Sequence, residues 1–277
     1  MSSSWSEFRR AFDYSSSRLN RDLTGEEAAR PLSAEGKLPT VLCFHGFGGL
    51  PLEIRLAFDE ARAAGLRARA PLLPGHGERP STLAKLRYED WLAGAREVFD
   101  EARSQGPVIL IGLSLGSLLA TELYLSAPGD VLGLGILANA FWLREPMPGL
   151  ALGLVQKLGL PDFGMAKFAS DIGDEQARAN HVSYGIQPVQ AAISLRAAGQ
   201  RLRDELFRVH CPTLILHGAR DRVCPVANAW RVAERLGSDD VRVVVLPRSH
   251  HIITRDSESP QVARELREFI ARIRTTS

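Results

Sequence analysis

The chain contains residues that can cooperate in acyl transfer in the order Ser114, Asp221 and a histidine pair, His250 and His251. A serine hydroxyl becomes an effective nucleophile when a histidine accepts its proton and a carboxylate holds that histidine in the correct tautomer. Ser114 is the centre of Gly-Leu-Ser-Leu-Gly at residues 112–116. In such a G-x-S-x-G pattern the serine lies on a sharp turn between a strand and a helix, where small neighbours are required. The pattern indicates a nucleophile elbow.

The residues on either side of Ser114 fit a strand followed by a helix. Residues 107–111 are an apolar run, Pro-Val-Ile-Leu-Ile, and residues 117–124 are compatible with a helix. The first N–H groups of a helix have no partner within it, and its N-terminus carries partial positive charge. We therefore expect Ser114 to lie above a group of oxyanion-stabilising donors. A glycine-flanked turn without catalytic function would show the same five residues. The two interpretations are therefore distinguished by whether the rest of the chain supplies a base and a carboxylate.

Asp221 and the two histidines each follow a predicted strand. The strand at residues 213–216 leads to Asp221, and the strand at residues 241–246 leads to His250 and His251. The carboxyl ends of parallel strands meet at one edge, where α/β proteins assemble their sites. A loop aspartate by itself is more often a solvated turn residue. The order serine, aspartate, histidine at three strand ends nevertheless favours a catalytic triad, with either histidine as the base.

Short apolar runs alternate with helical patterns from about residue 39, which is typical of a parallel sheet covered by helices on both faces. The expected strands are residues 40–44, 67–70, 108–111, 132–137, 213–216 and 241–246. The expected helices are residues 52–64, 88–104, 115–127, 226–236 and 260–274. The chain is therefore predicted to be an α/β protein with a mostly parallel central sheet.

This alternation stops between residues 143 and 205, where no strand is expected and proline and glycine separate helical fragments. We interpret residues 143–205 as a helical cap inserted into a core of residues 39–142 and 206–277, with residues 1–38 as an N-terminal extension. The cap is rich in flexible apolar side chains, which are Met147, Leu150, Leu152, Leu154, Val155, Leu158, Leu160, Phe163, Met165 and Phe168. They are expected either to line an acyl-chain site over Ser114 or to pack the cap onto the core.

The motifs taken together resemble those of the α/β-hydrolase superfamily, over roughly residues 39–272. They are His-Gly-Phe-Gly-Gly at 45–49, Leu-Pro-Gly-His-Gly at 73–77, Gly-Leu-Ser-Leu-Gly at 112–116, Gly-Ala-Arg-Asp at 218–221 and Ser-His-His at 249–251. Within the superfamily this set looks like the carboxylesterase and monoacylglycerol lipase branch. The resemblance implies the α/β-hydrolase fold with a helical cap and the triad order described above.

The resemblance also implies a role for each member of the triad. Ser114 is the implied nucleophile, and Asp221 is the carboxylate that orients the base. The closing motif of the branch usually reads Ser-Gly-His, so His251 is the implied base and His250 stands where glycine is usual. His250 is then expected to be an exposed loop residue, although its imidazole could also turn inward.

The oxyanion hole implied by the resemblance consists of the backbone N–H groups of Phe47 and Leu115. Such donors are fixed before the reaction and aim at charge that appears only in the tetrahedral state. Alternatively, the glycines around Phe47 only connect a strand to a helix. A departure from the family pattern is Ser117, where many members carry glycine, and we expect it to shift the elbow helix slightly.

The implied activity is that of a serine carboxylic-ester hydrolase acting through an acyl-enzyme on small-molecule esters of short to medium acyl chains, monoacylglycerols included. The same triad serves thioester hydrolysis, carbon–carbon bond hydrolysis and perhydrolysis, so these remain alternatives. A non-catalytic ligand-binding member of the fold is a further alternative. Epoxide and haloalkane hydrolysis are disfavoured, because their elbow nucleophile is normally aspartate and this chain has Ser114.

Composition limits the partners and the location of the protein. The 277 residues include 34 basic and 32 acidic side chains, a net charge of +2, without a long block of like charge. This argues against a nucleic-acid partner. Three cysteines cannot all pair and none lies in a C-x-x-C motif, which favours a reducing, cytoplasmic compartment. No secretory signal and no membrane-spanning run is expected.

The other histidines do not suggest further chemistry. His45, His76 and His217 adjoin glycines at predicted strand ends or in a tight loop, and we expect them to order these loops through hydrogen bonds. No metal-ligand spacing and no dinucleotide-binding G-x-G-x-x-G after a strand is found, so no metal and no cofactor is expected. The oligomeric state is left open.

Overall fold

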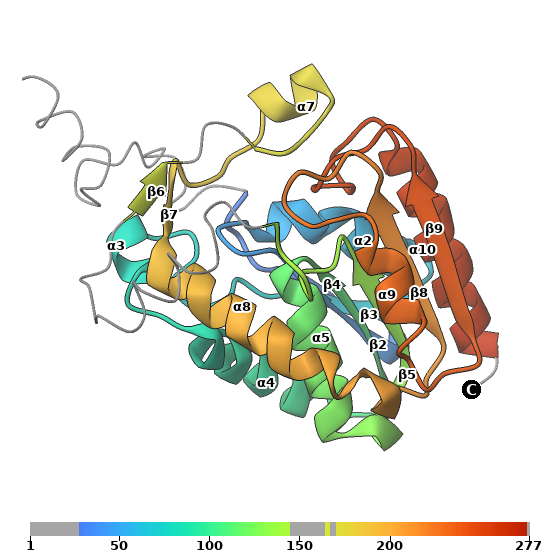
Figure 1. The fold of residues 1–277 in the computed structure, drawn as a ribbon. Helices are drawn as coiled ribbons and strands as arrows, with labels where there is room; N and C mark the ends of the chain where they lie inside the picture. Colours follow the sequence, from blue (N-terminus) through green and yellow to red (C-terminus); the bar gives the residue numbers. More distant parts are fainter. Residues whose placement is uncertain (1–27, 145–163, 167–169, 276–277) are drawn as a thin grey trace, which may run out of the picture.

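The computed structural model describes residues 28–144, 164–166 and 170–275. Its centre is a seven-stranded sheet of order β1-β3-β2-β4-β5-β8-β9 (Figure 1). The strands are β1 (Leu32–Ala34), β2 (Lys37–Phe44), β3 (Leu66–Ala70), β4 (Val108–Leu113), β5 (Val131–Leu137), β8 (Thr213–Gly218) and β9 (Val241–Leu246). β1 runs antiparallel to β3, and all other neighbours are parallel. The predicted α/β class with a mostly parallel sheet is confirmed.

Helices cover both faces of this sheet. One face carries α2 (Pro51–Ala63) and α10 (Ser259–Thr275). The other face carries α4 (Tyr88–Arg103), α5 (Leu115–Ser126), α8 (Val189–Arg203) and the shorter α9 (Asn228–Ala233). Short helical turns occur at α3 (Pro80–Leu83), η2 (Pro128–Asp130) and η3 (Leu206–Arg208). None of the helices in the described part of the chain combines the length and the apolar character needed to cross a bilayer.

The apolar run of β4 shows why the sheet must be covered twice. Ile109 and Ile111 pack into the core beneath α2 and α10, whereas Val108 and Leu110 pack into the core on the α4 and α5 side. Successive side chains of a strand point to opposite faces, so a strand buried on both faces is apolar throughout. This is the reason that the strand was recognisable from the sequence.

All six expected strands and all five expected helices form, with ends that shift by up to three residues. The structure adds β1, which lies within the expected N-terminal extension and pairs with β3. Three residues, Leu-Ser-Ala, are too short for a periodic pattern, so β1 could not be recognised. Residues 1–27, the greater part of that extension, lie outside the described residues.

The expectation that residues 143–205 contain no strand is wrong. β6 (Gly164–Ala166) and β7 (Ile186–Pro188) pair antiparallel as a separate two-stranded sheet, and α7 (Glu175–Ala179) lies between them in sequence. In Figure 1 these elements lie at the end of the molecule toward which the arrows of β8 and β9 point. Of the apolar residues expected to lie over Ser114, Met165 belongs to β6, and the others lie outside the described residues.

The turn between β4 and α5 has the backbone of a nucleophile elbow. Ser114 has φ 55° and ψ −113°, a region that costs on the order of 1–3 kcal/mol for a residue other than glycine. A Cβ on Gly112 would lie 2.0 Å from the carbonyl oxygen of Gly116, and a Cβ on Gly116 would lie 2.1 Å from that of Phe44. Strand, turn and helix can therefore meet this closely only if both positions are glycine.

We predict that Gly116→Ala lowers the free energy of unfolding by about 3 kcal/mol or more, because the added methyl group meets backbone that no side-chain rotation can clear. Urea-unfolding midpoints measure the change. Gly129→Ala is the matched control, since nothing lies within 4 Å of its Cβ position and the expected change is below about 0.5 kcal/mol. Equal midpoints for the two variants would contradict the argument.

Candidate active site

Ser114 lies at the point where the winding of the sheet reverses. From β2 the chain passes to β3 on one side, and then returns to β4 on the other side of β2. The loops that leave the carboxyl ends of β2 and β4 therefore diverge, and α/β proteins bind ligands in the crevice between such loops. The two loops are in contact, since a Cβ on Gly46 would lie 3.4 Å from the Cβ of Ser114.

Two backbone N–H groups at this point are available to an incoming oxygen. Around them, Gly48 donates to His76 Nε2 at 3.1 Å, and the Ser114 amide bonds to the neighbouring strand β5. Among the hydrogen bonds of the described residues, none uses the N–H of Phe47 or Leu115. Leu115 is the first residue of α5, where a helix has no internal acceptor to offer. These are the two donors that the resemblance implies, and their role as an oxyanion hole stays a prediction.

Two buried imidazoles order the loop that carries Phe47. His45 Nε2 accepts the N–H of Leu73, and His76 Nε2 accepts the N–H of Gly48, both at 3.1 Å. Burial lowers the pKa of both imidazoles, to about 3 for His76, so both stay neutral acceptors at neutral pH. The prediction that these histidines order loops by hydrogen bonding is confirmed.

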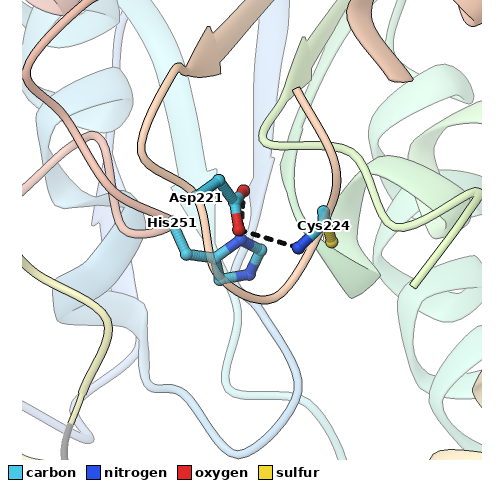
Figure 2. Close-up of side chains that lie close together, drawn as sticks. All are labelled: Asp221, Cys224 and His251. Carbon is cyan, nitrogen blue, oxygen red and sulfur yellow. Dashed lines mark hydrogen bonds and ion pairs between the residues drawn. The ribbon is translucent and has the colours of Figure 1, made fainter. Parts of the chain in front are cut away.

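The loops after β8 and β9 bring Asp221 and His251 into contact (Figure 2). His251 Nδ1 lies 2.8 Å from Asp221 Oδ2, and His217 Nε2 lies 3.2 Å from the same oxygen. Asp221 Oδ1 accepts the N–H groups of Val223 at 2.8 Å and Cys224 at 2.7 Å. The carboxylate is thus held by four nitrogens, and one of them belongs to the imidazole that the family pattern implies as the base.

Burial and charge act in opposite directions on this pair. Burial by itself would raise the pKa of Asp221, but the charge of His251 and the hydrogen bonds from both histidines hold that pKa well below its usual range. Burial opposes protonation of His251, yet the carboxylate raises the pKa of its imidazole well above 6.5. An ionised carboxylate that favours the imidazolium is what a general base needs once it has accepted a proton.

His250 is buried, so the expectation of an exposed loop residue is wrong. It is 8% exposed, and its Nδ1 lies 3.4 Å from Asp256 Oδ2. Its backbone N–H also donates to Asp256, at 2.8 Å. A Cβ on Gly173 would lie 2.5 Å from His250 Nδ1, so this imidazole packs against the segment between β6 and β7, which we call the inserted segment. His250 turns away from Asp221 because that segment covers it, which the local sequence does not reveal.

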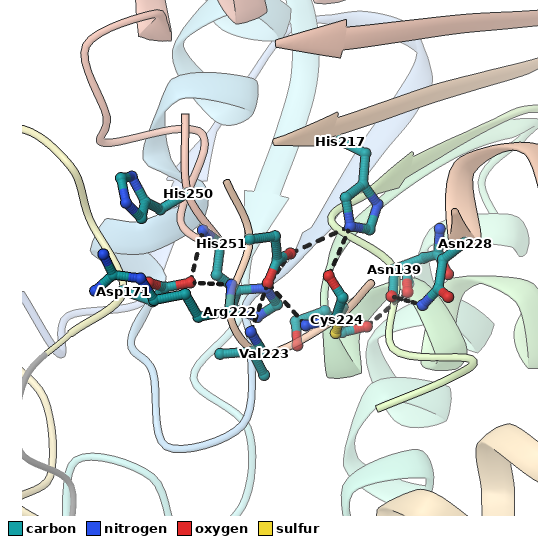
Figure 3. Close-up of polar contacts among 12 residues, drawn as sticks. Asn139, Asp171, His217, Arg222, Val223, Cys224, Asn228, His250 and His251 are labelled. Atoms are coloured by element: carbon teal, nitrogen blue, oxygen red, sulfur yellow. Dashed lines mark hydrogen bonds and ion pairs between the residues drawn. The ribbon is translucent and has the colours of Figure 1, made fainter. Parts of the chain in front are cut away.

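Asp171 is a functional candidate that the sequence reasoning missed (Figure 3). Its Oδ2 accepts the N–H of Arg222 at 2.8 Å and the N–H of His251 at 3.2 Å, and its carbonyl oxygen accepts the N–H of Ile252 at 3.1 Å. One carboxylate from the inserted segment therefore ties together the loops that carry Asp221 and His251. Asp171 lies in an irregular stretch, so no pattern could have marked it.

A second link joins the inserted segment to the base of the Phe47 loop. His181 Nε2 lies 3.0 Å from Glu53 Oε1, and their side chains are 1% and 6% exposed. Glu53 also fills the space beside the loop, since a Cβ on Gly49 would lie 1.9 Å from Glu53 Oε2. Thr254, three residues after His251, donates its hydroxyl to the Glu53 carbonyl. Neither Glu53 nor His181 carried any signal in the sequence.

Ser117, the other departure from the family pattern, is accommodated within the elbow helix. Its hydroxyl donates to the Ser114 carbonyl oxygen at 2.6 Å, and Thr121 donates to the Ser117 carbonyl oxygen at 2.8 Å. Both side chains are buried. The Ser114 carbonyl oxygen also accepts the Ser117 N–H at 3.0 Å, so the hydroxyl adds a second donor that glycine would not provide.

One group in the described residues has the composition of a metal site. The carboxylate of Asp221, the thiol of Cys224 and the imidazole of His251 place ligand atoms within 4.8 Å of one another. Such a set suits zinc or another soft divalent cation. Here the same atoms are engaged by the Asp221 and His251 hydrogen bond, and burial raises the pKa of the thiol. The spacing of these residues along the chain did not predict this grouping.

Comparison with known proteins supports the fold described above. The family model described as Hydrolase_4, serine aminopeptidase, S33, matches residues 37–258. A thermostable monoacylglycerol lipase from Bacillus sp. (strain H-257) is 27% identical, covering 88% of this chain and 95% of that protein. A carboxylesterase from Bacillus subtilis (strain 168) is 21% identical, covering 88% and 97%. A solved structure from the metagenome-derived lipolytic enzymes LipS and LipT has a TM-score of 0.77 at 27% identity, covering 90% and 98%.

We predict that Asp221→Asn lowers the pKa of His251, because the amide removes the negative charge that outweighs burial. In the wild type the titration midpoint of the His251 imidazole should lie above pH 6.5. The imidazole is protonated below its midpoint and neutral above it. Proton NMR of the imidazole as a function of pH measures both midpoints. Asp204→Asn, which changes an exposed carboxylate, is the control and should leave the midpoint in place. A midpoint that stays or rises in Asp221→Asn would overturn the electrostatic account.

Proposed function

Because this chain belongs to the serine aminopeptidase S33 family, Hydrolase_4, of the α/β-hydrolase superfamily, we propose that it cleaves carboxylic esters through Ser114, His251 and Asp221. The observation that carries the proposal is the 2.8 Å contact of His251 with Asp221 at the same sheet edge as the strained Ser114 turn. A buried imidazole with an ionised carboxylate on Nδ1 keeps Nε2 for the exchange of a proton.

In the first half of the reaction, Ser114 Oγ attacks the carbonyl carbon of the ester while His251 accepts the hydroxyl proton. The carbonyl π electrons move onto oxygen, and this oxyanion accepts hydrogen bonds from the N–H groups of Phe47 and Leu115. Asp221 stays ionised and stabilises the imidazolium. The tetrahedral intermediate then collapses, the bond to the alcohol oxygen breaks, and the imidazolium donates its proton to the departing alcohol.

In the second half, water replaces the alcohol. His251 takes a proton from the water as its oxygen attacks the acyl-enzyme, and the same two N–H groups hold the second oxyanion. Collapse of this intermediate breaks the bond to Ser114 Oγ, which recovers its proton from the imidazolium. One ester and one water thus give one acid and one alcohol, and the protein's groups return to their starting state. No cofactor is needed for this sequence.

The choice of an ester is supported by the relatives that this chain spans almost entirely, one named as a monoacylglycerol lipase and the other as a carboxylesterase. The family takes its description from an aminopeptidase, so amides are the first competitor to test. We propose small-molecule esters with short to medium acyl chains, monoacylglycerols included, because residues 143–205 supply many flexible apolar side chains.

Three free, buried thiols support a reducing, cytoplasmic location.

We predict that p-nitrophenyl ester hydrolysis falls by about 10⁶ in Ser114→Ala and His251→Asn and by about 10⁴ in Asp221→Asn, following the magnitudes known for serine-protease triads. His250→Asn should retain activity, because His250 contacts Asp256 and not Asp221. Initial rates across acyl chains from acetyl to palmitoyl measure the effects and give the preferred chain length. Turnover by Ser114→Ala at the wild-type rate would refute the mechanism.

Labelling by an activated fluorophosphonate separates an enzyme from a ligand-binding member of the same fold. The wild type should be labelled on Ser114 and should also turn over esters many times, while Ser114→Ala should not be labelled. Labelling without multiple turnover would contradict the proposed activity. Labelling requires only an accessible, activated serine, whereas turnover also requires the second half of the reaction.

We further predict that esters are preferred over matched thioesters and over aminoacyl p-nitroanilides, measured as kcat/KM on substrates that share one acyl group. The two relatives that this chain spans almost entirely support an ester substrate, and a peptidase would require a group that binds the free amine. The Ser114→Ala variant supplies the background for each substrate. A higher kcat/KM on the thioester or on the anilide would replace the proposed substrate class while leaving the triad in place.

A further inference from the structure

An arginine cluster surrounds one tryptophan between α8 and α9. The guanidinium carbon of Arg203 lies 4.6 Å from the ring centroid of Trp142, that of Arg235 5.2 Å and that of Arg231 5.6 Å. Arg203 ends α8, Arg231 lies within α9, and Arg235 follows α9 by two residues. Trp142 follows β5, so three separate parts of the chain meet here. We call these four residues the Trp142 cluster.

The positive charges of the Trp142 cluster are not matched by carboxylates. Arg203 donates to the Phe141 carbonyl oxygen at 2.7 Å, and Arg235 donates to the Arg231 carbonyl oxygen at 2.9 Å. In the described part of the chain, none of the three guanidinium groups lies within ion-pair distance of an acid. Arginines nearby do pair, since Arg201 lies 2.8 Å from Glu122. The chain as a whole is almost neutral, at +2, so this local excess is not a consequence of its composition.

The three guanidinium groups repel one another. The pKa of Arg203 is lowered by burial and then by the neighbouring charges of Arg196, Arg231 and Arg235, with Asp204 as the acid that opposes them. Arg231 and Arg235 are exposed, whereas Arg203 and Trp142 are half-buried. Like charges held this close weaken the folded state unless an anion neutralises them. The Trp142 ring contacts the flat face of a guanidinium group. The N–H groups lie in the guanidinium plane, so those that do not already donate to a carbonyl can bind such an anion.

We propose that the Trp142 cluster is a binding site for a phosphate group, carried either by a soluble phosphate ester or by a phospholipid headgroup. A phosphate dianion has the charge to offset two guanidinium groups and enough oxygens to accept paired N–H donors from several arginines. A carboxylate has half of that charge and two oxygens. The site does not depend on the proposed ester hydrolysis.

The cluster adjoins the loop that carries Asp221. Asn228 Nδ2 donates to the Trp142 carbonyl oxygen at 2.7 Å, and the Arg144 N–H donates to the Val223 carbonyl oxygen at 2.8 Å. Val223 in turn donates to Asp221 Oδ1. A phosphate group bound at the cluster would therefore lie next to the proposed site and outside it, as a headgroup or a phosphorylated part of a substrate would.

The first test is isothermal titration calorimetry of the full chain with inorganic pyrophosphate. Arg231→Gln/Arg235→Gln removes two exposed members of the cluster, and Arg62→Gln/Arg267→Gln is the control, since it removes the same charge from arginines that pair with Asp59 and Glu60. Binding should weaken at least tenfold in the cluster variant and stay within twofold in the control. Circular dichroism establishes that both variants are folded. Equal weakening in both variants would overturn the proposal.

The second test distinguishes the two sources of the phosphate group. Cosedimentation compares phosphatidylcholine vesicles with and without phosphatidic acid, for the wild type and for the same two double variants. Binding only to the vesicles that contain phosphatidic acid, lost in the cluster variant, supports the site with a lipid headgroup. Pyrophosphate binding without vesicle binding supports it with a soluble phosphate ester. Absence of both, or binding that the cluster variant retains, refutes it.

Discussion

The backbone of Ser114 is the constraint around which the rest of the site is arranged. Its φ of 55° is held because Gly112 and Gly116 allow β4, the turn and α5 to approach within distances that no side chain would permit. The sheet supplies the force that holds this turn, since β4 is paired on both sides and buried on both faces. Local strain is therefore maintained by packing on a much larger scale.

Carboxylates perform a related task for the other two loops. Asp221, Asp171 and Asp256 each accept two or more N–H groups, and most of these donors are backbone amides of irregular segments. Loops that leave a sheet have few partners for their amides, so a side-chain acceptor can fix a conformation that secondary structure cannot. The position of His251 thus depends on acids contributed by three different parts of the chain.

Periodicity and glycine placement made the core predictable, because β4 and the Ser114 turn are defined by neighbours in sequence. The three-residue strands and the burial of His250 could not be predicted, since they depend on the inserted segment and on pairing too short to leave a pattern. The same is true of Asp171 and of the pair formed by Glu53 and His181, whose partners lie far away along the chain. Local order was readable, and the motifs brought Asp221 and His251 together, whereas the polar contacts of Asp171, Glu53 and His181 left no pattern.

The contact of Glu53 with His181 limits how far this protein can be treated as interchangeable modules. When one member of a buried polar contact is removed, the other keeps its desolvation cost without that contact, which destabilises the folded state. A segment taken from a relative would therefore need to place a polar group against Glu53, or Glu53 would have to change together with the exchange. Exchange of this segment between relatives thus requires coordinated changes on both sides of the contact.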